Sequence, residues 1–501
     1  MQHPEQHPEL QHYLQDEGQE DAQGDQRAQE QAGPPDPETL AELRRVEREL
    51  LARWPENRPQ PSLDRITALM DLLGEPQRAY PVIHLTGTNG KTSTARMIDA
   101  LLRERDLRVG RFTSPHLESM RERISIDGAP VSAEAFVGAY EDVRPFVEMV
   151  DATQPVPMSF FEVLVGMAYA AFADTPVDVA VVEVGMGGSW DATNVANGAV
   201  SVVTPISVDH TQFLGSSLEE IAGEKAGIIK AGATAVLAQQ QVTVAELLMR
   251  RSVEVGASVA REGLEFGVLR RDVAVDGQLV ALQGLGTTYE GVFLPAFGTH
   301  QASNAACALA AVEVFLGADQ EIDPELVRGA LARTDSPGRL ERLRSSPAVL
   351  VDAAHNPAGV AASVNAITES FDFTRLVGVV AAMEDKDVRS FLEQLEPVLA
   401  DIVVTRNSLQ RSMPVDDLAA LAVEVFGPER VVVEPRLDDA IDEGVRLAEE
   451  SEEYAGAGVL ITGSVVTAGD ARALLGGGPS GTSGRSRPSG PEAAVEEGGG
   501  A

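Results

Sequence analysis

Residues 82–94 read Val-Ile-His-Leu-Thr-Gly-Thr-Asn-Gly-Lys-Thr-Ser-Thr, and the organisation of the chain can be worked out from them. The apolar run Val82–Leu85 is followed by a glycine-containing turn and then by the helical pattern of Ala95–Glu104. A strand, a turn and a helix in this order direct backbone N–H groups and a helix N-terminus toward an anion. Lys91 would reach the β and γ phosphates of a nucleotide, and Thr92 would lie near Mg²⁺. The stretch therefore predicts a nucleotide-binding loop, with a plain glycine turn before a capped helix as the alternative.

This loop is shorter than the common G-x-x-x-x-G-K-[ST] form, because Leu85 stands where that form has its first glycine. The loop residues that we expect to contact ATP are Gly87, Thr88, Asn89, Gly90, Lys91, Thr92 and Ser93.

Short apolar runs alternate with helical patterns along the rest of the chain. Their hydrophobicity is continuous rather than alternating, which is typical of strands buried on both faces in mostly parallel α/β sheets. The runs are Val82–Leu85, Val179–Val184, Val200–Val203, Val349–Val351, Leu376–Val380, Ile402–Val404 and Val459–Ile461. By contrast, Gly263–Leu294 alternates between glycine-containing turns and predicts a small antiparallel sheet.

The chain of 501 residues exceeds what one hydrophobic core usually organises. The turn-rich segment Arg333–Gly338 lies between a helical stretch and a new strand, so we place a domain boundary there. We expect an ATP-binding domain at 38–334 and a C-terminal α/β domain at 335–475, with a ligand cleft between them. The polar ends, 1–37 and 476–501, are expected to be disordered.

The composition excludes several classes of function. The net charge of −37 argues against nucleic acid and anionic membrane as partners, because both require a basic surface. No apolar run is long enough to span a bilayer and the N-terminus has no signal-peptide pattern, so we expect a soluble cytoplasmic protein. Cys307 is the only cysteine and is interpreted as a small buried apolar residue.

Lysine is scarce in this chain. The 40 basic residues comprise 4 Lys and 36 Arg, and the lysines are Lys91, Lys225, Lys230 and Lys386. Codon bias toward arginine is one explanation. Lysines that persist under such a bias should be enriched where a compact ammonium or a reactive amine is required.

A second motif, residues 181–194, reads Val-Val-Glu-Val-Gly-Met-Gly-Gly-Ser-Trp-Asp-Ala-Thr-Asn. It places Glu183 at the end of a buried strand, before a glycine-rich loop. A carboxylate in this position is suited to hold Mg²⁺, since glycines let a ligand approach the backbone. The alternative is a buried glutamate paired with a base elsewhere in the chain.

Together, the short G-T-N-G-K loop and the E-V-G-x-G-G-x-x-D-A-T-N motif resemble the Mur ligase superfamily, and most closely its folylpolyglutamate synthase/dihydrofolate synthase family. The resemblance covers Asp64–Gly469. It implies an α/β fold: a P-loop NTPase-like N-terminal domain with a mostly parallel sheet, followed by a smaller Rossmann-like domain. Ser189 stands where the family usually has arginine, so a contact made by that arginine is in doubt here.

The resemblance also implies a set of metal ligands. In Thr113–Leu117, Ser114 matches a serine that binds one Mg²⁺ together with Glu183. Thr92, which directly follows the loop lysine, is expected near the metal as well. His210 matches the histidine that binds a second Mg²⁺, with Glu183 and a carbamylated Lys225. Without the resemblance, Lys225 would be a surface helix lysine beside Glu224. The implied catalytic residues are Lys91, Glu183, His210 and Lys225.

Further residues are assigned to ATP by the same resemblance. Asn304, in H-Q-A-S-N-A-A, matches an asparagine that contacts phosphate, although by itself it would be interpreted as a helix cap. Arg339 matches a phosphate-binding arginine and Asp352 a ribose-binding aspartate, in D-A-A-H-N-P where the family has D-G-A-H-N-P. Lys386 lies in a family-like M-x-D-K-D segment and has no definite role.

The family's pterin-binding position corresponds to Ser159, and Phe160 and Phe161 could stack on the ring or belong to the core. The resemblance therefore implies an ATP-dependent ligase that activates a carboxylate as an acyl phosphate and joins L-glutamate to folate or dihydropteroate, with two Mg²⁺ ions. We expect a monomer. The alternatives are a muramyl amino-acid ligase of the same superfamily, favoured by Thr92 and Ser93, and a nucleotide-binding regulatory protein without ligase activity.

Overall fold

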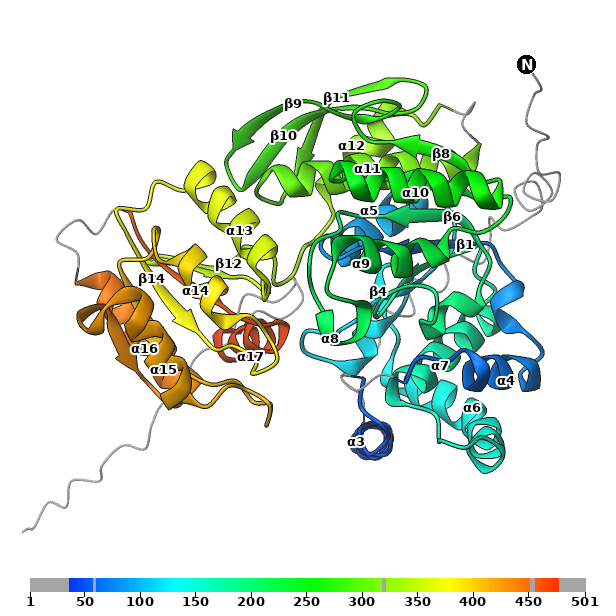
Figure 1. The fold of residues 1–501 in the computed structure, drawn as a ribbon, viewed down its shortest axis with the longest axis horizontal. Helices are drawn as coiled ribbons and strands as arrows, with labels where there is room; N and C mark the ends of the chain where they lie inside the picture. The colour runs from blue at the N-terminus through cyan, green and yellow to red at the C-terminus, as the bar shows by residue number, and fades with distance from the viewer. Residues whose placement is uncertain (1–35, 57–59, 318–320, 451–455, 477–501) are drawn as a thin grey trace, which may run out of the picture.

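The computed structural model describes residues 36–56, 60–317, 321–450 and 456–476. They form two α/β domains that lie side by side, the first coloured blue to green and the second yellow to red in Figure 1. The chain passes between them after helix α12 (Pro324–Ala332) and before strand β12 (Glu341–Ser345). This crossing falls in the predicted turn-rich segment.

The first domain contains an eight-stranded sheet in the order β4-β3-β2-β5-β1-β6-β7-β8, in which β2, β5, β1, β6, β7 and β8 are parallel. The strands are β1 (Val82–Thr86), β2 (Val109–Phe112), β3 (Ile124–Ile126), β4 (Ala129–Pro130), β5 (Val179–Glu183), β6 (Gly198–Val203), β7 (Thr234–Leu237) and β8 (Ser258–Arg261). β1 lies centrally, between β5 and β6. The loop that follows β1 is therefore in the middle of the sheet's carboxyl edge.

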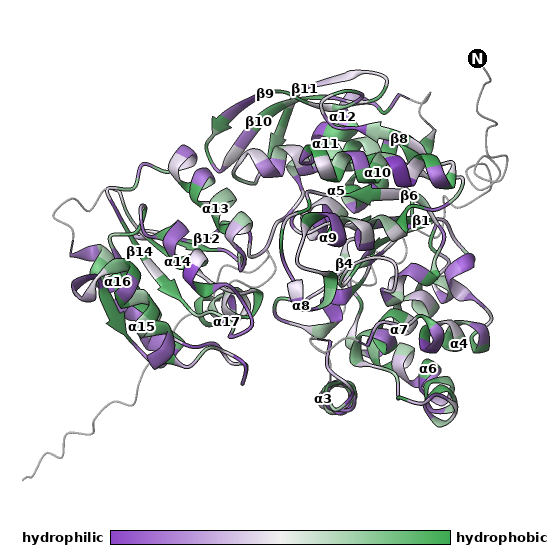
Figure 2. Ribbon diagram, viewed as in Figure 1, coloured by the Kyte–Doolittle hydropathy of each residue, from purple (hydrophilic) through white to green (hydrophobic). Residues whose placement is uncertain are grey.

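Helices cover both faces of this sheet. They are α3 (Pro37–Leu51), α4 (Asp64–Leu72), α5 (Lys91–Arg103), α6 (Ala133–Thr153), α7 (Phe160–Asp174), α8 (Thr211–Leu214), α9 (Leu218–Lys225), α10 (Val242–Val255), α11 (Thr299–Leu316) and α12, with short 3₁₀ turns η1 (Pro76–Arg78), η2 (Met120–Arg123), η3 (Ala192–Val195) and η4 (Ala226–Ile228). Figure 2 shows hydrophobic and hydrophilic residues alternating along helices such as α10, as expected for helices with one buried face.

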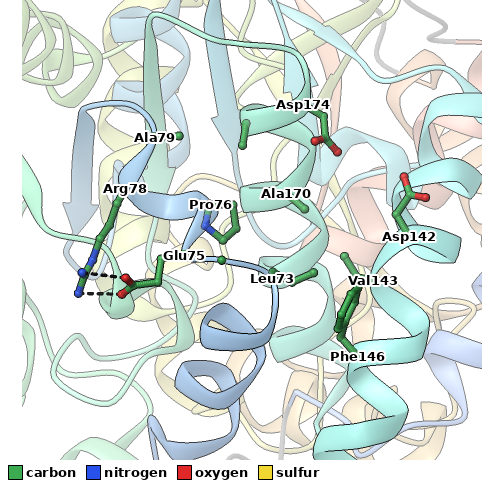
Figure 3. A pocket seen from close by; sticks show the side chains of 12 residues that line it. Leu73, Glu75, Pro76, Arg78, Ala79, Asp142, Val143, Phe146, Ala170 and Asp174 are labelled. Atoms are coloured by element: carbon green, nitrogen blue, oxygen red, sulfur yellow. Dashed lines mark hydrogen bonds and ion pairs between the residues drawn. The ribbon is translucent and has the colours of Figure 1, made fainter.

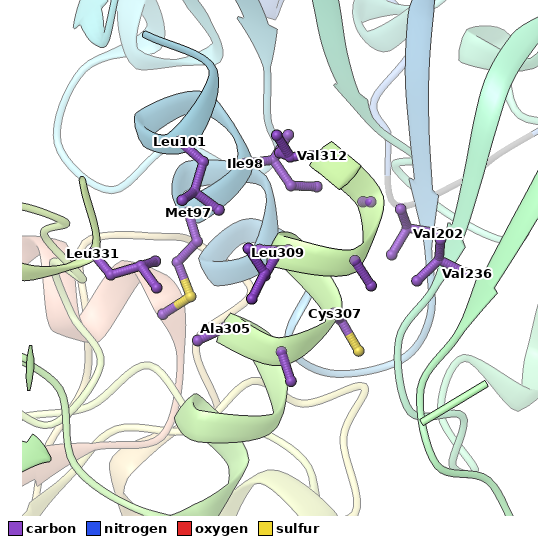
Figure 4. Packing of buried hydrophobic residues seen from close by; sticks show 14 of the residues in the cluster. Met97, Ile98, Leu101, Val202, Val236, Ala305, Cys307, Leu309, Val312 and Leu331 are labelled. Carbon is purple, nitrogen blue, oxygen red and sulfur yellow. The ribbon is translucent and has the colours of Figure 1, made fainter. Parts of the chain in front are cut away.

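Strand β5 explains the continuous apolar runs. Val179 and Val181 belong to the core cluster that packs against α5 and α11, whereas Ala180 and Val182 belong to the cluster on the opposite face. Both faces of the strand are thus buried, and polar residues have no place on either. Cys307 is buried in the first cluster, which confirms its interpretation as a core residue (Figure 4).

A three-stranded antiparallel sheet, in the order β11-β10-β9, is attached to the first domain. Its strands are β9 (Gly267–Ala274), β10 (Gly277–Gln283) and β11 (Thr288–Leu294), so the predicted antiparallel segment is confirmed. The sheet lies over α11 (Figure 1).

The second domain has a six-stranded sheet in the order β12-β13-β17-β14-β15-β16, parallel except for β12. Its elements are β12, β13 (Ala348–Val351), α13 (Pro357–Ser370), β14 (Arg375–Val380), α14 (Val388–Leu395), β15 (Asp401–Val404), α15 (Val415–Phe426), η5 (Pro428–Arg430), β16 (Val431–Val433), α16 (Leu437–Glu449), β17 (Ala457–Thr462) and α17 (Val465–Leu475). All seven apolar runs named from the sequence are strands of the two large sheets.

The ends of the described part of the chain differ slightly from expectation. Asp36 caps α3 by accepting hydrogen bonds from the N–H groups of Glu38 and Thr39, and Pro37 is the first helical residue. Residues 36 and 37 are therefore structured, and so is Gly476, which ends α17. The remainder of the two expected tails, 1–35 and 477–501, lies outside the described residues. Among the described helices, none has the length and apolar character that crossing a membrane requires.

Candidate active site

The loop between β1 and α5 has the geometry of a phosphate-binding turn. Gly87 and Gly90 have φ angles of 146° and 89°, which a side chain rarely adopts. Space also requires glycine: a Cβ on Gly87 would lie 1.9 Å from Oγ1 of Thr204, and one on Gly90 would lie 2.5 Å from Oδ1 of Asn304. Helix α5 begins at Lys91, four residues before the predicted start, so its first-turn N–H groups belong to the loop.

A cavity of about 320 Å³ opens at this loop, between the two domains. Every residue that the sequence assigned to ATP or metal lines it: Gly87, Thr88, Asn89, Gly90, Lys91, Thr92, Ser93, Ser114, Glu183, His210, Lys225, Asn304, Arg339 and Asp352. Its wall also includes Asp209, His355 and Ser363. Residues from distant parts of both domains thus converge on one site.

Glu183 ends β5 and projects into the cavity with only 1% of its surface exposed. Both carboxylate oxygens accept hydrogen bonds from Oγ1 of Thr92 at 3.0 Å, and the N–H of Ser114 donates to Oε2 at 3.4 Å. Burial raises the pKa of Glu183, although Lys91 and these hydrogen bonds act against it. Within the described residues, no basic side chain forms an ion pair with Glu183. This carboxylate therefore has capacity for a cation.

Lys91 and Lys225 both donate a hydrogen bond to the carbonyl oxygen of Gly87. The ammonium of Lys91 donates to the carbonyl oxygens of Gly87 and Thr88 at 3.1 and 3.2 Å, and that of Lys225 donates to Gly87 at 2.8 Å. Burial lowers the pKa of Lys91. Burial, followed by the charge of Lys91, lowers the pKa of Lys225 to about 7. Lys225 is only 5% exposed, so it is not a surface helix lysine.

His210 caps α8 with a left-handed backbone, φ 52°, and lines the cavity beside Asp209. Burial lowers the pKa of His210 to about 4, which leaves the imidazole neutral and able to bind a metal ion. In the described part of the chain, no group of three or more His, Cys, Asp or Glu residues is close enough to hold a metal ion. A divalent cation here would therefore have few carboxylate or imidazole ligands from the described residues, as is usual for Mg²⁺, which completes its coordination with water and substrate phosphates.

Asp209 was not assigned a role from the sequence, and it joins the domains. Its carboxylate accepts hydrogen bonds from Nζ of Lys386 at 2.8 Å and from Nδ2 of Asn356 at 3.2 Å, both in the second domain. Burial would raise the pKa of Asp209, but His210, Lys386 and His355 outweigh it, so the pKa is lowered. Nδ2 of Asn356 also donates to Oδ1 of Asn89 in the loop at 3.1 Å. In the sequence, the only indication of a role for Asp209, Lys386 and Asn356 was that each lies within or next to a recognised motif.

Asp352 has a structural role in addition to its place in the cavity wall. Its carboxylate accepts hydrogen bonds from the N–H groups of Leu340 and Ala354 and from Oγ of Ser363, at 2.9, 3.0 and 2.8 Å. Leu340 has a left-handed backbone with φ 44°, which is a strained conformation for leucine. By holding Leu340, Asp352 fixes the segment that carries Arg339 into the cavity.

Asn304 and Ala353 resolve two points left open by the sequence. Asn304 lies within α11 rather than at its start, so the helix-cap interpretation is wrong. Its Nδ2 donates to Oε1 of Gln301 at 3.1 Å, and its Oδ1 is the atom that a Cβ on Gly90 would meet. Ala353 has no left-handed backbone, so alanine is accommodated where the family has glycine.

The expected pterin residues do not line this cavity. Ser159 caps α7, accepting from the N–H of Glu162 at 3.2 Å, and Phe160 is buried with the guanidinium of Arg123 at 5.0 Å from its ring centre. Phe161 is partly exposed and lies directly behind the cavity wall: a Cβ on Gly185 would lie 2.4 Å from its ring. Only Phe161 is thus in contact with the site.

Ser189 is exposed, and its Oγ donates to the backbone oxygen of Glu224 at 3.0 Å, next to Lys225. It is packed against Gly227, on which a Cβ would lie 2.1 Å from Oγ of Ser189.

A larger hollow of about 600 Å³ lies away from the loop, between η1, α6 and α7 (Figure 3). Its charged residues include the ion pair Glu75–Arg78, and it contains none of the predicted site residues.

Comparisons with known proteins agree with this geometry. The family model described as the Mur ligase middle domain matches residues 159–312, and that of the Mur ligase glutamate ligase domain matches residues 338–465. The chain is 52% identical over 468 residues to a dihydrofolate synthase/folylpolyglutamate synthase of Mycobacterium tuberculosis (strain ATCC 25618 / H37Rv), covering 89% of this chain and 96% of that protein.

Solved structures give the same result. The folylpolyglutamate synthase of Mycobacterium tuberculosis complexed with ADP matches with a TM-score of 0.84 at 52% identity, covering 87% of this chain and 99% of that one. A folylpolyglutamate synthase complex with AMPPCP and folate matches with a TM-score of 0.73 at 29% identity, covering 86% and 99%. Both the resemblance and the two-domain α/β fold expected from the sequence are confirmed. The chain belongs to the Mur ligase family, within its folylpolyglutamate synthase/dihydrofolate synthase branch.

Proposed function

We infer that this protein is an ATP-dependent ligase that joins L-glutamate to a folate, releasing ADP and phosphate. The observation that carries this conclusion is the convergence of the loop, Glu183, Lys225 and Arg339 on one cavity between the domains. The family relationship supports it, because the relative from Mycobacterium tuberculosis is named for this activity and a related structure contains both an ATP analogue and folate.

In the first step, a carboxylate oxygen of the folate attacks the γ-phosphorus of ATP, and the bond from that phosphorus to the β-γ bridging oxygen breaks. The products are an acyl phosphate and ADP. This transfer requires charge neutralisation and alignment more than covalent participation by the protein. Lys91 and Arg339 would supply positive charge from the first and second domain, while the N–H groups at the start of α5 would hold the phosphates.

In the second step, the amine of L-glutamate attacks the acyl carbon, the amide bond forms and phosphate leaves. The amine loses one proton in this step and the departing phosphate takes it up, so that the products are the amide and hydrogen phosphate. The cavity includes residues of the second domain, so docking of that domain limits access of water to the acyl phosphate.

The residues present fit two Mg²⁺ ions. Glu183 is a buried carboxylate that accepts hydrogen bonds from hydroxyl and amide donors and has capacity for a cation. Ser114, Glu183 and Thr92 would hold one ion, and Glu183, His210 and Lys225 the other. Bound there, Mg²⁺ would neutralise charge on the phosphate oxygens.

Lys225 fits that role only when carbamylated. The ammonium would first lose one proton. The neutral amine would then attack CO₂, forming an N–C bond as one C=O π bond opens and losing a second proton to solvent, so that a cation becomes a carbamate anion. Lys225 is buried and has Gly87 O as its hydrogen-bond acceptor, and no carboxylate of the described residues forms an ion pair with it. An unpaired buried ammonium is unfavourable, and carbamylation beside a divalent cation removes that cost.

We also propose that dihydropteroate is accepted in place of folate, that the pterin lies near Ser159 and Phe161, and that the protein acts as a cytoplasmic monomer. Phe161 supports this pterin position because its ring contacts Gly185 of the cavity wall. Size-exclusion chromatography with light scattering tests the monomer.

The decisive experiment measures ADP release with three acceptor mixtures: tetrahydrofolate with L-glutamate, dihydropteroate with L-glutamate, and a UDP-muramyl acceptor with amino acids. We expect turnover with the first two. Turnover only in the mixture with the muramyl acceptor would show that the substrate is a peptidoglycan precursor and not a folate. ATP binding without ADP release in any mixture would favour the regulatory alternative.

A further inference from the structure

The segment Ser114–Ser119 leaves the active-site cavity and crosses to the second domain. At its start, the N–H of Ser114 donates to Glu183. Three residues later, Leu117 packs against an apolar cluster made of second-domain residues, among them Val351, Ala468 and Ala471. One short segment of the first domain therefore touches the predicted metal ligand at one end and the core of the second domain at the other.

Helix α17 approaches this segment more closely than any side chain would allow. A Cβ on Gly469 would lie 2.0 Å from the carbonyl oxygen of Leu117, a separation that real Cβ atoms do not have. Gly469 has ordinary helical backbone, so the close approach, and not an unusual φ, is what requires glycine here. Alanine would have to displace either the helix or the segment.

An ion pair reinforces the contact from the same helix. Nε of Arg472 donates to Oε1 of Glu118 at 2.6 Å, and its Nη1 is paired with Glu341 in the second domain. The side chain of Arg472 is 8% exposed, whereas that of Glu118 is 30% exposed. The guanidinium is thus held by its own domain and presented to the segment.

The segment is also stiffened internally. The carboxylate of Glu122 accepts hydrogen bonds from three consecutive N–H groups, those of Leu117, Glu118 and Ser119, at 2.9, 3.0 and 2.7 Å. Three charge-assisted bonds to one carboxylate restrict the backbone between them. These bonds hold Leu117, Glu118 and Ser119 as one unit, which only Pro115 and His116 separate from Ser114.

We propose that helix α17 of the second domain holds the 114–119 segment in the conformation that places Ser114 at the metal site, which makes Leu117, Glu118, Gly469 and Arg472 positioning residues for the ligase reaction. The proposal rests on the proposed function, because Ser114 is a metal ligand only in that scheme. Docking of the second domain thereby completes the Mg²⁺ site of the first.

The test compares Gly469→Ala with Gly138→Ala in the full chain. Both substitutions replace a helical glycine by alanine, a change that by itself favours the helix. A Cβ at Gly138 would meet nothing within 4 Å. We expect Gly469→Ala to raise the Mg²⁺ concentration for half-maximal turnover about tenfold, the lower range of effects for partners of metal ligands. Gly138→Ala should leave it unchanged.

A second readout does not depend on turnover. In hydrogen exchange without nucleotide, the amides of Leu117, Glu118 and Ser119 should exchange faster in Gly469→Ala, and not in Gly138→Ala. Leu117→Ala and Arg472→Gln remove contacts without inserting an atom, so they test the proposal if Gly469→Ala fails to fold. Arg446→Gln, which alters an exposed ion pair, is the control for Arg472→Gln.

Unchanged Mg²⁺ requirement and unchanged exchange in these variants would overturn the proposal. An equal effect of the control variants would overturn it too. Loss of the proposed function is recognised separately, as absence of ADP release by the unmodified protein with folate and L-glutamate. In that case the exchange comparison still decides whether α17 holds the segment.

Discussion

The ammonium of Lys386 lies 2.8 Å from Oδ1 of Asp209 and joins the two domains beside the candidate metal site. The two side chains are 14% and 10% exposed, so the pair is largely shielded from water and salt. Asp209 directly precedes His210, and Nδ2 of Asn356 donates to its other carboxylate oxygen. The position of His210 therefore depends on a contact with the second domain.

Lys386→Ala should lower kcat/KM about 30-fold, because removing one partner of a buried interface charge pair costs about 2 kcal/mol or more. Steady-state kinetics with folate and L-glutamate check this. Arg389→Ala is the matched control: its pair with Glu424 is about half exposed, with side-chain exposures of 48% and 59%, and should change kcat/KM less than about twofold. If Lys386→Ala and Asp209→Asn are additive when combined, the pair does not act as a unit.

Lys91→Ala should lower kcat by about a hundredfold or more, since it removes a positioned charge from the phosphate site. Turnover at saturating ATP measures the effect. Lys230→Ala is the comparison, because Lys230 does not line the cavity and this substitution should keep near-normal activity. Near-normal turnover of Lys91→Ala would remove the loop lysine from the mechanism.

Lys225→Arg should be inactive, since arginine keeps a positive charge but does not form a carbamate. With ¹³C-bicarbonate, NMR should show a protein carbamate signal that is absent in Lys225→Arg and retained in Lys230→Arg. If Lys225→Arg is active, the role of Lys225 is purely structural. The same conclusion follows if the carbamate signal is lost only in Lys230→Arg.

Phe161→Leu should raise the KM for folate about tenfold, because base- or pterin-sized rings gain about 1–3 kcal/mol from aromatic stacking. ATP binding in the absence of folate, measured by calorimetry, should stay within about twofold. Phe160→Leu should instead lower the free energy of unfolding by about 1 kcal/mol with little change in KM, since Phe160 packs under Arg123 in the core. Equal KM values for folate in the unmodified protein, Phe161→Leu and Phe160→Leu would show that the pterin binds elsewhere.

The strands were predictable because burial on both faces leaves a continuous apolar run, as in Val179–Val184. The start of α5 was placed too late for a related reason. Its first turn faces the cavity and carries Lys91, Thr92 and Ser93 in place of apolar residues, so the hydrophobic period begins only further along the helix.

Asn304 shows the limit of local interpretation. An asparagine near the start of a helical pattern suggests a cap, but Gln301 and His300 already lie within α11. The side chain of Asn304 turns toward Gly90, more than two hundred positions earlier in the sequence. Local propensity carries no information about that neighbour.

The sequence alone indicated a glycine loop ending in Lys91 and a strand ending in Glu183, because the backbone setting of each is encoded by its neighbours. Lys225 was singled out differently, by the scarcity of lysine and by the family resemblance. Only the tertiary structure decided that Asp209 pairs with Lys386, and that Leu117 lies under Gly469. These contacts join residues of different domains, and their geometry depends on how two finished surfaces pack, which no short stretch of sequence specifies.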